Sequence, residues 1–72
     1  MASVIEMDVA SRAKSALAHS PIYVLREIQV ETEGDMLLLQ GNVDSFYHKQ
    51  LAQEIVRVVA DGMRVVNSLS VD

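Results

Sequence analysis

The side chains best suited to chemistry in this chain are two histidines, His19 and His48, and the carboxylates. A metal site needs three or four converging ligands, and we expect neither histidine to have acidic partners at ligand spacing. Acid-base catalysis needs paired carboxylates in a pocket, whereas these acids fall on a predicted hairpin, on outer faces of predicted helices and at the end of the sequence. The pattern predicts no metal centre and no acid-base site. His19 instead suits a helix C-terminus, where its protonated form is favoured.

Nucleophilic and phosphate-binding motifs are missing as well. The serines fall in predicted caps, turns and strand edges, and none stands in a G-x-S-x-G turn. Gly34, Gly41 and Gly62 are too far apart to form a phosphate-cradling loop, and there is no cysteine for thiol chemistry or disulfides. We predict that the domain is not an enzyme and uses no cofactor.

Composition and charge describe a small folded domain. The 72 residues are half apolar and 22% charged, which suits one globule near the lower size limit for a single core. Ten acids against six bases give a formal charge of −4, and this field repels nucleic acid and anionic lipid. No apolar run approaches the roughly 18 residues of a transmembrane helix, and no leader-like start is visible. As written, the sequence has the features of a cytoplasmic protein, but its localisation stays open, and no nucleic-acid partner is expected.

A helix over about residues 4–18 is predicted from capping and spacing. Ser3 and Glu6 form a capping box, and apolar residues then recur every three or four positions. Asp8 and Arg12 are placed as an i,i+4 pair on the opposite side. Pro21 ends the helix, because the residue before a proline is pushed out of the α region.

A hairpin follows the first helix. From about residue 26, Ile28 and Val30 alternate with polar residues, as in a strand with one buried face. Tyr23 and Leu25, just before this strand, are expected to close the edge of the core. Gly34 supplies the positive φ of the turn, and a second strand is predicted over about residues 36–42.

The remaining residues predict a second helix and a third strand. Asp44 or Ser45 can cap the helix, and Gly62 suits the left-handed position after its end. Leu69 and Val71 alternate with serines in a strand over about residues 65–71. The apolar stripe of the helix comprises His48, Leu51, Ala52, Ile55, Val56 and Val59.

These elements predict an α+β fold with the order α-β-β-α-β, forming a single domain over residues 1–72 with its core in about 4–71. The hairpin makes the first two strands antiparallel, and a right-handed helical crossover makes the second and third parallel. We expect a two-layer sandwich in which two helices pack on one face of a three-stranded mixed sheet. The other face is left to solvent or to a partner.

The unbroken apolar run Met36 to Leu39 raises the question of which strand face is covered. If Leu37 and Leu39 face the helices, Met36 and Leu38 point to the open face, where they suit a binding surface for another chain or a lipid. The alternative is ordinary surface scatter, because over half of a protein surface is apolar. Extension of the patch by Tyr23, Leu25 or Val65 would favour binding.

A family resemblance rests on motifs spread over about residues 4–71. These are the N-terminal amphipathic helix, an Ile-x-Val strand, a glycine turn, a Leu-x-Leu-x-Gly-x-Val segment, a helix with Ala and Ile, a further glycine and a Val-Asn-x-Leu-x-Val ending. The chain therefore resembles the BON domain, a small α/β module of bacterial envelope and osmotic-stress proteins. The residues that carry the resemblance are Ile28, Val30, Gly34, Leu37, Leu39, Gly41, Val43, Ala52, Ile55, Gly62, Val66, Asn67, Leu69 and Val71.

The resemblance implies a non-enzymatic domain, often periplasmic, that is proposed to bind phospholipid or to mediate contacts in the cell envelope. It carries over no catalytic residue. Gly34, Gly41, Gly62 and Asn67 match recurrent positions and suit structural roles: a turn, close approach of a helix, a helix stop, and polar anchoring at the start of a strand.

Two hypotheses for function follow. Membrane or phospholipid association would use Phe46, Tyr47, Lys49, Arg57 and Arg64, although the acidic hairpin weighs against anionic lipid. The alternative for Phe46 is that it folds back over the first turn of its helix.

Protein assembly, including self-association, would instead use Met36 and Leu38 or the edge of the sheet. The α-β-β-α-β order is also found in KH-like RNA-binding domains and in ring-building domains of secretins. This chain lacks the GXXG loop of KH domains. Ring-building domains need no motif, so homo-oligomerisation remains open.

Overall fold

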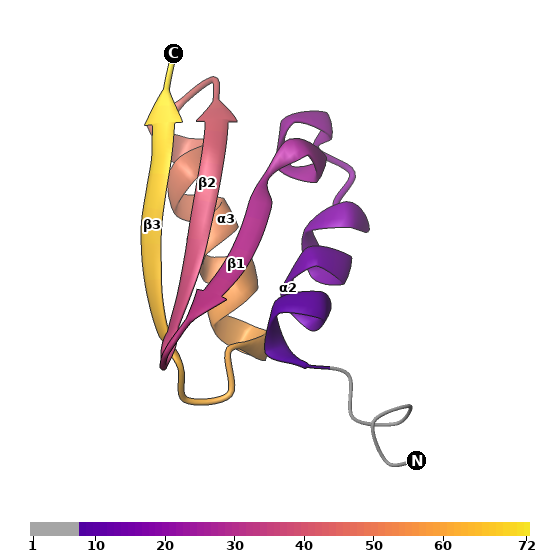
Figure 1. Cartoon of the computed structure of the whole chain (residues 1–72). Coiled ribbons are helices and arrows are strands. Elements are labelled where there is room, and N and C mark those ends of the chain that lie inside the picture. Colours follow the sequence, from indigo (N-terminus) through magenta and orange to yellow (C-terminus); the bar gives the residue numbers. More distant parts are fainter. Residues whose placement is uncertain (1–7) are drawn as a thin grey trace.

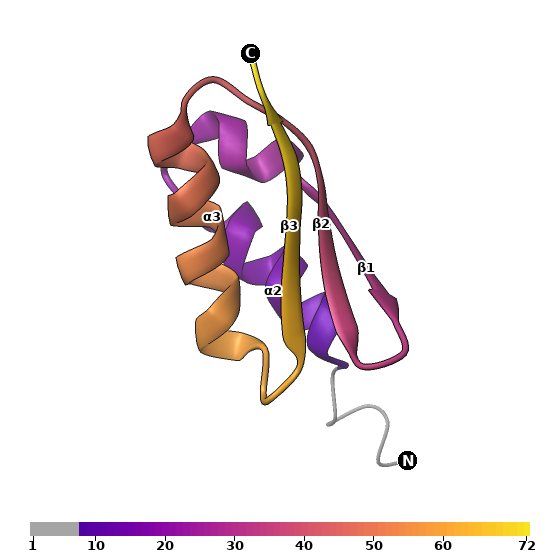
Figure 2. The same cartoon turned by 90° about the vertical axis from the view of Figure 1, so that its left-hand side faces the viewer.

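The computed structural model describes residues 8–72 as one helical layer on one mixed sheet (Figure 1). Strand β2 is central, antiparallel to β1 and parallel to β3. Helices α2 and α3 lie on the same face of the sheet (Figure 2). This arrangement confirms the predicted α+β class. The elements are α2 (Val9–Ala18), the 3-10 helix η1 (Tyr23–Glu27), β1 (Gln29–Glu33), β2 (Met36–Val43), α3 (Phe46–Val59) and β3 (Arg64–Val71).

The described part of the first helix begins at Val9 and is capped by Asp8, whose carboxylate accepts the Ser11 N–H at 2.7 Å. The backbone N–H of Ser11 holds the pKa of Asp8 below its usual value. The predicted capping box of Ser3 and Glu6 lies outside the described residues. The ion pair of Arg12 is with Asp61, at 3.8 Å, and not with Asp8 as predicted, although the charge of Arg12 still contributes to lowering the pKa of Asp8.

The connection from α2 to the sheet is a 3-10 helix, so β1 begins at Gln29 and not near residue 26. Leu25 is fully buried in this turn and closes the core, as expected. Tyr23 is 70% exposed, so the expectation for this residue was wrong. A 3-10 turn places residues three apart on one side, and Tyr23 and Leu25 therefore cannot both face inward.

The hairpin has a two-residue turn, because Glu33 pairs with Met36. Gly34 has φ +61. A positive φ at the first turn position only is the type II′ geometry, which matches the twist of the flanking strands. This confirms the predicted turn.

Helix α3 is capped by Ser45, whose hydroxyl accepts the His48 N–H at 3.1 Å. Its C-cap is Ala60, and the next residue, Asp61, takes the left-handed conformation at φ +52. Gly62, at φ +87, lies one position later than predicted. Asp61 tolerates this conformation because a short polar side chain suffers less there than most residues.

The core lies between the helices and the inner sheet face. Leu37 and Leu39 have no exposed surface, while Met36 and Leu38 are half-buried and lie outside the core cluster. The predicted rotation of β2 is therefore confirmed. The buried apolar residues are Ala13, Leu17, Leu25, Ile28, Val30, Leu37, Leu39, Val43, Ala52, Val56, Ala60 and Leu69.

Gly41 lies near the end of the pairing between β1 and β2 and has φ +132. A Cβ there would lie 3.8 Å from the Glu27 carbonyl oxygen and from Ile28 Cα, which is ordinary contact. The predicted close approach of a helix is therefore not the reason for glycine. Glycine is needed there because of the backbone conformation, since residues with a Cβ rarely adopt this φ.

Candidate binding surfaces

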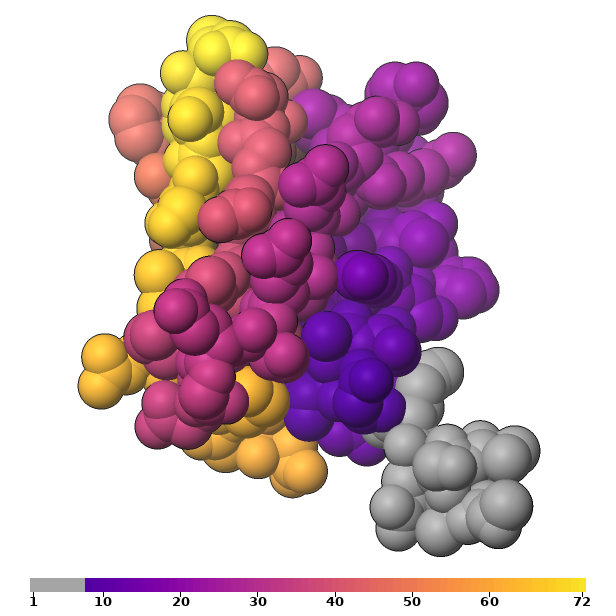
Figure 3. Space-filling model, in the orientation of Figure 1, coloured from indigo at the N-terminus to yellow at the C-terminus, as the bar shows by residue number. Residues whose placement is uncertain are grey.

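The sheet face opposite the helices carries an apolar strip along its two parallel strands. Met36 and Leu38 point to this face, and the register of β2 with β3 sets Val66 beside Leu38. All three side chains are half-buried, and none packs against the helix-side core. Among residues 8–72 no helix crosses this face, which Figure 3 shows from the front. The strip of Met36, Leu38 and Val66 is therefore accessible.

Charged residues border this strip in a defined order. Glu31 pairs with Leu38, and Glu33 pairs with Met36, so β1 gives the face an acidic margin. Arg64 pairs with Met36 on the other side. The row Glu33, Met36, Arg64 thus runs from acidic through apolar to basic across the sheet. A charge order of this kind could orient a bound partner as well as contact it.

The extension of the strip differs from the prediction. Val65, one of the three candidates, points to the helices and packs on the core, and Leu25 is buried there as well. Val66 provides the extension instead. The alternation of Leu69 and Val71 with serines, continued back along β3, already assigns Val66 to the outer face.

A second exposed apolar site lies at the start of α3. Phe46 is 74% exposed and Tyr47 is 68% exposed. Both precede the buried stripe of Ala52 and Val56, and their helical angles point them away from it. Phe46 therefore does not fold back over the first turn. Val58 is still more exposed, at 84%, near the other end of the same helix.

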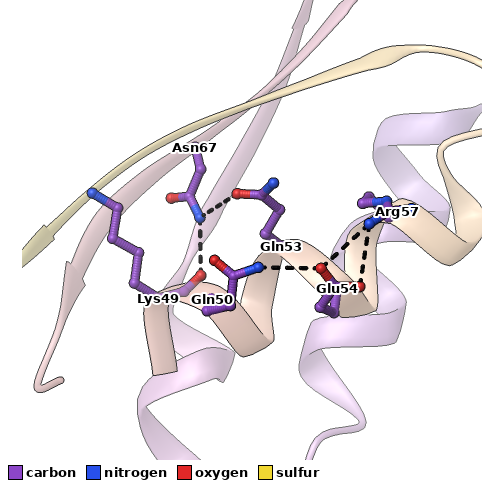
Figure 4. Close-up of polar contacts among 6 residues, drawn as sticks. All are labelled: Lys49, Gln50, Gln53, Glu54, Arg57 and Asn67. Atoms are coloured by element: carbon purple, nitrogen blue, oxygen red, sulfur yellow. Dashed lines mark hydrogen bonds and ion pairs between the residues drawn. The ribbon is translucent and has the colours of Figure 1, made fainter. Parts of the chain in front are cut away.

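The basic residues predicted to accompany these aromatics do not gather around them. Arg57 lies eleven positions after Phe46, about 16 Å along a helix, and its guanidinium contacts the Glu54 carboxylate at 3.4 Å. Arg64 lies beside Met36 on the open sheet face. Lys49 is half-buried beside Asn67 of β3 (Figure 4). Only Lys49 is near the aromatic pair in the chain.

Asn67 joins β3 to α3 (Figure 4). Its side-chain amide donates to the Lys49 carbonyl at 2.9 Å and to the Gln53 side-chain oxygen at 3.1 Å. Its side-chain oxygen accepts the Leu69 N–H at 3.2 Å. The predicted structural role therefore has a physical basis, but its position is the middle of β3 and not the start.

The two histidines each make a contact within their own helix region. His48 contacts the Asp44 carboxylate through Nδ1, and this hydrogen bond lowers the pKa of Asp44. The i,i+4 spacing was a signal for this pair that the sequence analysis missed. His19 caps the C-terminus of α2 and contacts the Ser15 carbonyl at 2.7 Å, as expected of a helix-terminal histidine. Residues 8–72 contain no group of three or more His, Cys, Asp or Glu placed to hold a metal ion.

A shallow hollow lies between the two helices, lined by Arg12, Val58, Val59 and Asp61. The ion pair of Arg12 with Asp61 occupies its rim. None of the helices described in residues 8–72 has the length and apolar character needed to cross a membrane. The open sheet face and the start of α3 are the candidates for binding because each presents accessible apolar side chains.

Comparison with known proteins agrees with the resemblance noted from the sequence. Among curated proteins, none matches this chain. The family model of the BON domain matches residues 6–72, which include every element described above. Membership of this family supports a non-enzymatic binding module in general terms. The chain belongs to the BON domain family.

Proposed function

We propose that this domain is a protein-binding module whose contact surface is the open sheet face. The observation that supports this proposal is the strip of Met36, Leu38 and Val66 on a face that no described helix covers. Covering these side chains would stabilise a complex by about 25 cal/mol for each Å² of apolar area removed from water. The strip gives the contact its apolar centre.

The charges around the strip favour a protein partner over an anionic membrane. Glu31 and Glu33 border the strip, and the whole chain carries a net charge of −4. A surface of anionic headgroups would meet these carboxylates with like charge. A protein partner with an apolar centre and a basic margin would instead complement them.

The test compares two substitutions on one strand face. Leu38→Glu should abolish capture of the partner from an extract of the source cells, because it places a charge in the centre of the contact. Gln40→Glu adds the same charge at an exposed position of the same face and should retain capture. The captured protein, once purified, should bind the wild type and Gln40→Glu, but not Leu38→Glu, in calorimetry. If no purified protein shows this dependence on Leu38, the proposal is wrong.

Membrane association is the second candidate, supported by the adjacent exposed side chains of Phe46 and Tyr47. Aromatic rings of this kind can enter the headgroup region, and Lys49 lies nearby in the chain. The site would bind zwitterionic or weakly anionic lipid, since only one basic residue accompanies the rings. Phospholipid binding by Arg57 and Arg64 together with these rings would need all four side chains close together, but Arg57 lies about 16 Å along α3 from Phe46 and Arg64 lies on the open sheet face.

Co-sedimentation with phosphatidylcholine and phosphatidylglycerol vesicles at low salt tests this candidate. The double variant Phe46→Ala/Tyr47→Ala should lose binding, whereas Val58→Ala removes an equally exposed apolar side chain elsewhere on α3 and should retain it. If the wild type binds neither the phosphatidylcholine nor the phosphatidylglycerol vesicles, the membrane hypothesis is wrong. The result leaves the sheet-face proposal unaffected, because Phe46 and Tyr47 lie on the helical layer.

A further inference from the structure

The two outer edges of the sheet are built differently. β1 spans five residues and carries Glu31 and Glu33, so it is short and charged. β3 spans eight residues, and the stretch from Val65 to Val71 contains neither a charge nor a proline. Proteins usually protect an exposed edge by shortening it, charging it or placing proline on it. β1 has the first two of these features, whereas β3 is long and carries a charge only at its first residue, Arg64.

The backbone groups at the outer edge of β3 can be identified from the two ends of its pairing with β2. Arg64 N–H donates to the Asp35 carbonyl at 3.0 Å, and Asp72 N–H donates to the Val43 carbonyl at 2.9 Å. In a parallel pair, alternate residues direct their N–H and C=O to the neighbouring strand. Even-numbered residues of β3 therefore face β2. The odd-numbered residues Val65, Asn67, Leu69 and Val71 direct these groups outward.

Nothing else in residues 8–72 pairs with this edge. The sheet ends at β3, and Figure 2 looks directly onto that strand with no element in front of it. One of the outward groups already has a partner, since the Leu69 N–H donates to the Asn67 side chain. The N–H groups of Val65, Asn67 and Val71 remain for an additional strand.

A second copy of β3 fits this edge by symmetry and charge. With the two strands antiparallel and their two-fold axis at Ser68, Val65 pairs with Val71 of the other copy and Asn67 pairs with Leu69. This register aligns the whole strand. In the two central pairs the Asn67 N–H donates to the Leu69 carbonyl of the other copy, while the Leu69 N–H keeps its bond to the Asn67 side chain. The register also sets Arg64 opposite Asp72 of the other copy. Arg64 lies on the open face beside Met36, and the Asp72 carboxylate, which follows β3, accepts the Asn42 side-chain amide at 3.0 Å. Opposite charges facing each other across strands stabilise such a pair.

We propose that two copies of this domain associate through their β3 edges, antiparallel and centred on Ser68, to form a continuous six-stranded sheet. The symmetric contact is self-complementary, as a two-fold dimer requires. It also joins the two open faces into one larger surface carrying both copies of Met36, Leu38 and Val66. The dimer is distinct from the sheet-face contact proposed above, because it uses backbone groups at the edge of the sheet, whereas that contact uses side chains on its open face.

The first test places a lysine at the centre of the contact. Ser68→Lys should weaken association by about tenfold, because two ammonium groups then face each other at the two-fold axis. Gln29→Lys is the matched control. Gln29 and Ser68 both pair with Gln40, so they lie in one row of the same face, but on opposite edges. Both are exposed, and the lysine should leave the folded monomer intact in circular dichroism.

Sedimentation velocity from about 10 μM to about 1 mM, the range expected for a small interface, gives the measurement. The wild type and Gln29→Lys should approach twice the 7.9 kDa mass of the monomer at the highest concentrations, and Ser68→Lys should need about tenfold more protein to reach the same average mass. A wild type that stays monomeric throughout overturns the proposal. Equal loss in both lysine variants overturns it as well, since that result indicates a general charge effect.

The second test determines the register. Arg64→Glu alone and Asp72→Arg alone should each weaken the dimer, because like charges then face each other. The double variant Arg64→Glu/Asp72→Arg restores opposite charges and should recover the wild-type mass. If the double variant is no better than the single ones, this register is wrong. If Leu38→Glu is the substitution that abolishes association while Ser68→Lys does not, the copies meet through their faces and the edge proposal fails.

Discussion

Leu38 and Leu39 are the same residue type, adjacent in one strand, and they lie on opposite faces of the sheet. Leu39 has no exposed surface and belongs to the core, while Leu38 is half-buried beside Val66 and outside that core. Side chains on the inner face must be apolar and well packed for the domain to fold. The outer face is free of that requirement, so its apolar strip is available for binding.

The largest expected difference between the two faces is in stability. Leu39→Ala should lower the free energy of unfolding by about 3 to 4 kcal/mol, because it leaves a cavity in the core. Leu38→Ala should lower it by less than about 1 kcal/mol, because the side chain is already partly in water. Urea unfolding followed by circular dichroism measures both values. Similar losses for the two variants would contradict the assignment of faces.

Amphipathic patterns were enough to predict the inward side chains of β1 and of α3. In β2, where apolar residues run without a break, the register of the family motif placed Leu37, Leu39 and Val43 toward the helices, and the hairpin and crossover rules gave the strand directions. The hydrogen-bond partners of Asn67 could not be predicted from such patterns. Its partners, Lys49 and Gln53, lie in another element, and spacing within β3 says nothing about which helix turn lies above it.

The candidate binding residues were less predictable than the fold. Helical spacing placed Phe46 correctly on an outer face, but it did not show that Arg57 would pair with Glu54, three residues earlier. Tyr23 was misplaced because the 3-10 turn of η1 follows neither the period of a strand nor that of an α-helix. Exposed side chains have few packing constraints, so their grouping depends on the assembled structure.

Asn67 is the polar member of the covered face and gives the next largest effect. Asn67→Asp should lower the free energy of unfolding by about 2 kcal/mol, because an acceptor replaces the amide that donates to the Lys49 carbonyl and Gln53. Ser70→Asp introduces the same charge on the exposed face of β3 and should change stability little. Urea midpoints of the two variants at pH 7 make the comparison. Equal midpoints would contradict the role of Asn67 as a joint between sheet and helix.

Gly41 tests the backbone of β2, the strand of Leu38 and Leu39, at the point where its pairing with β1 ends. Gly41→Ala should cost about 1 to 2 kcal/mol, because a residue with a Cβ is strained at φ +132. The added methyl group meets only ordinary contacts, so the loss reports conformation and not crowding. Gln40→Ala, at the preceding exposed position, is the control and should be nearly neutral. A neutral Gly41→Ala would show that the strand relaxes to a negative φ.

The smallest expected effect is the loss of stability in acid that comes from the Asp8 cap of α2. Helix α2 covers only the inner face of the sheet. The pKa of Asp8 is lowered by the Ser11 N–H that its carboxylate caps. A carboxyl group with a lower pKa in the folded state stabilises the fold fully above its unfolded pKa of about 3.9, and this contribution is lost as the pH falls through the folded pKa.

Asp8→Asn keeps a capping oxygen without the titration. The wild type should therefore lose stability relative to Asp8→Asn when the pH is lowered from about 5 to about 2, as measured by urea midpoints. A constant difference between the two proteins across that range would show that the cap does not depend on the charge of Asp8.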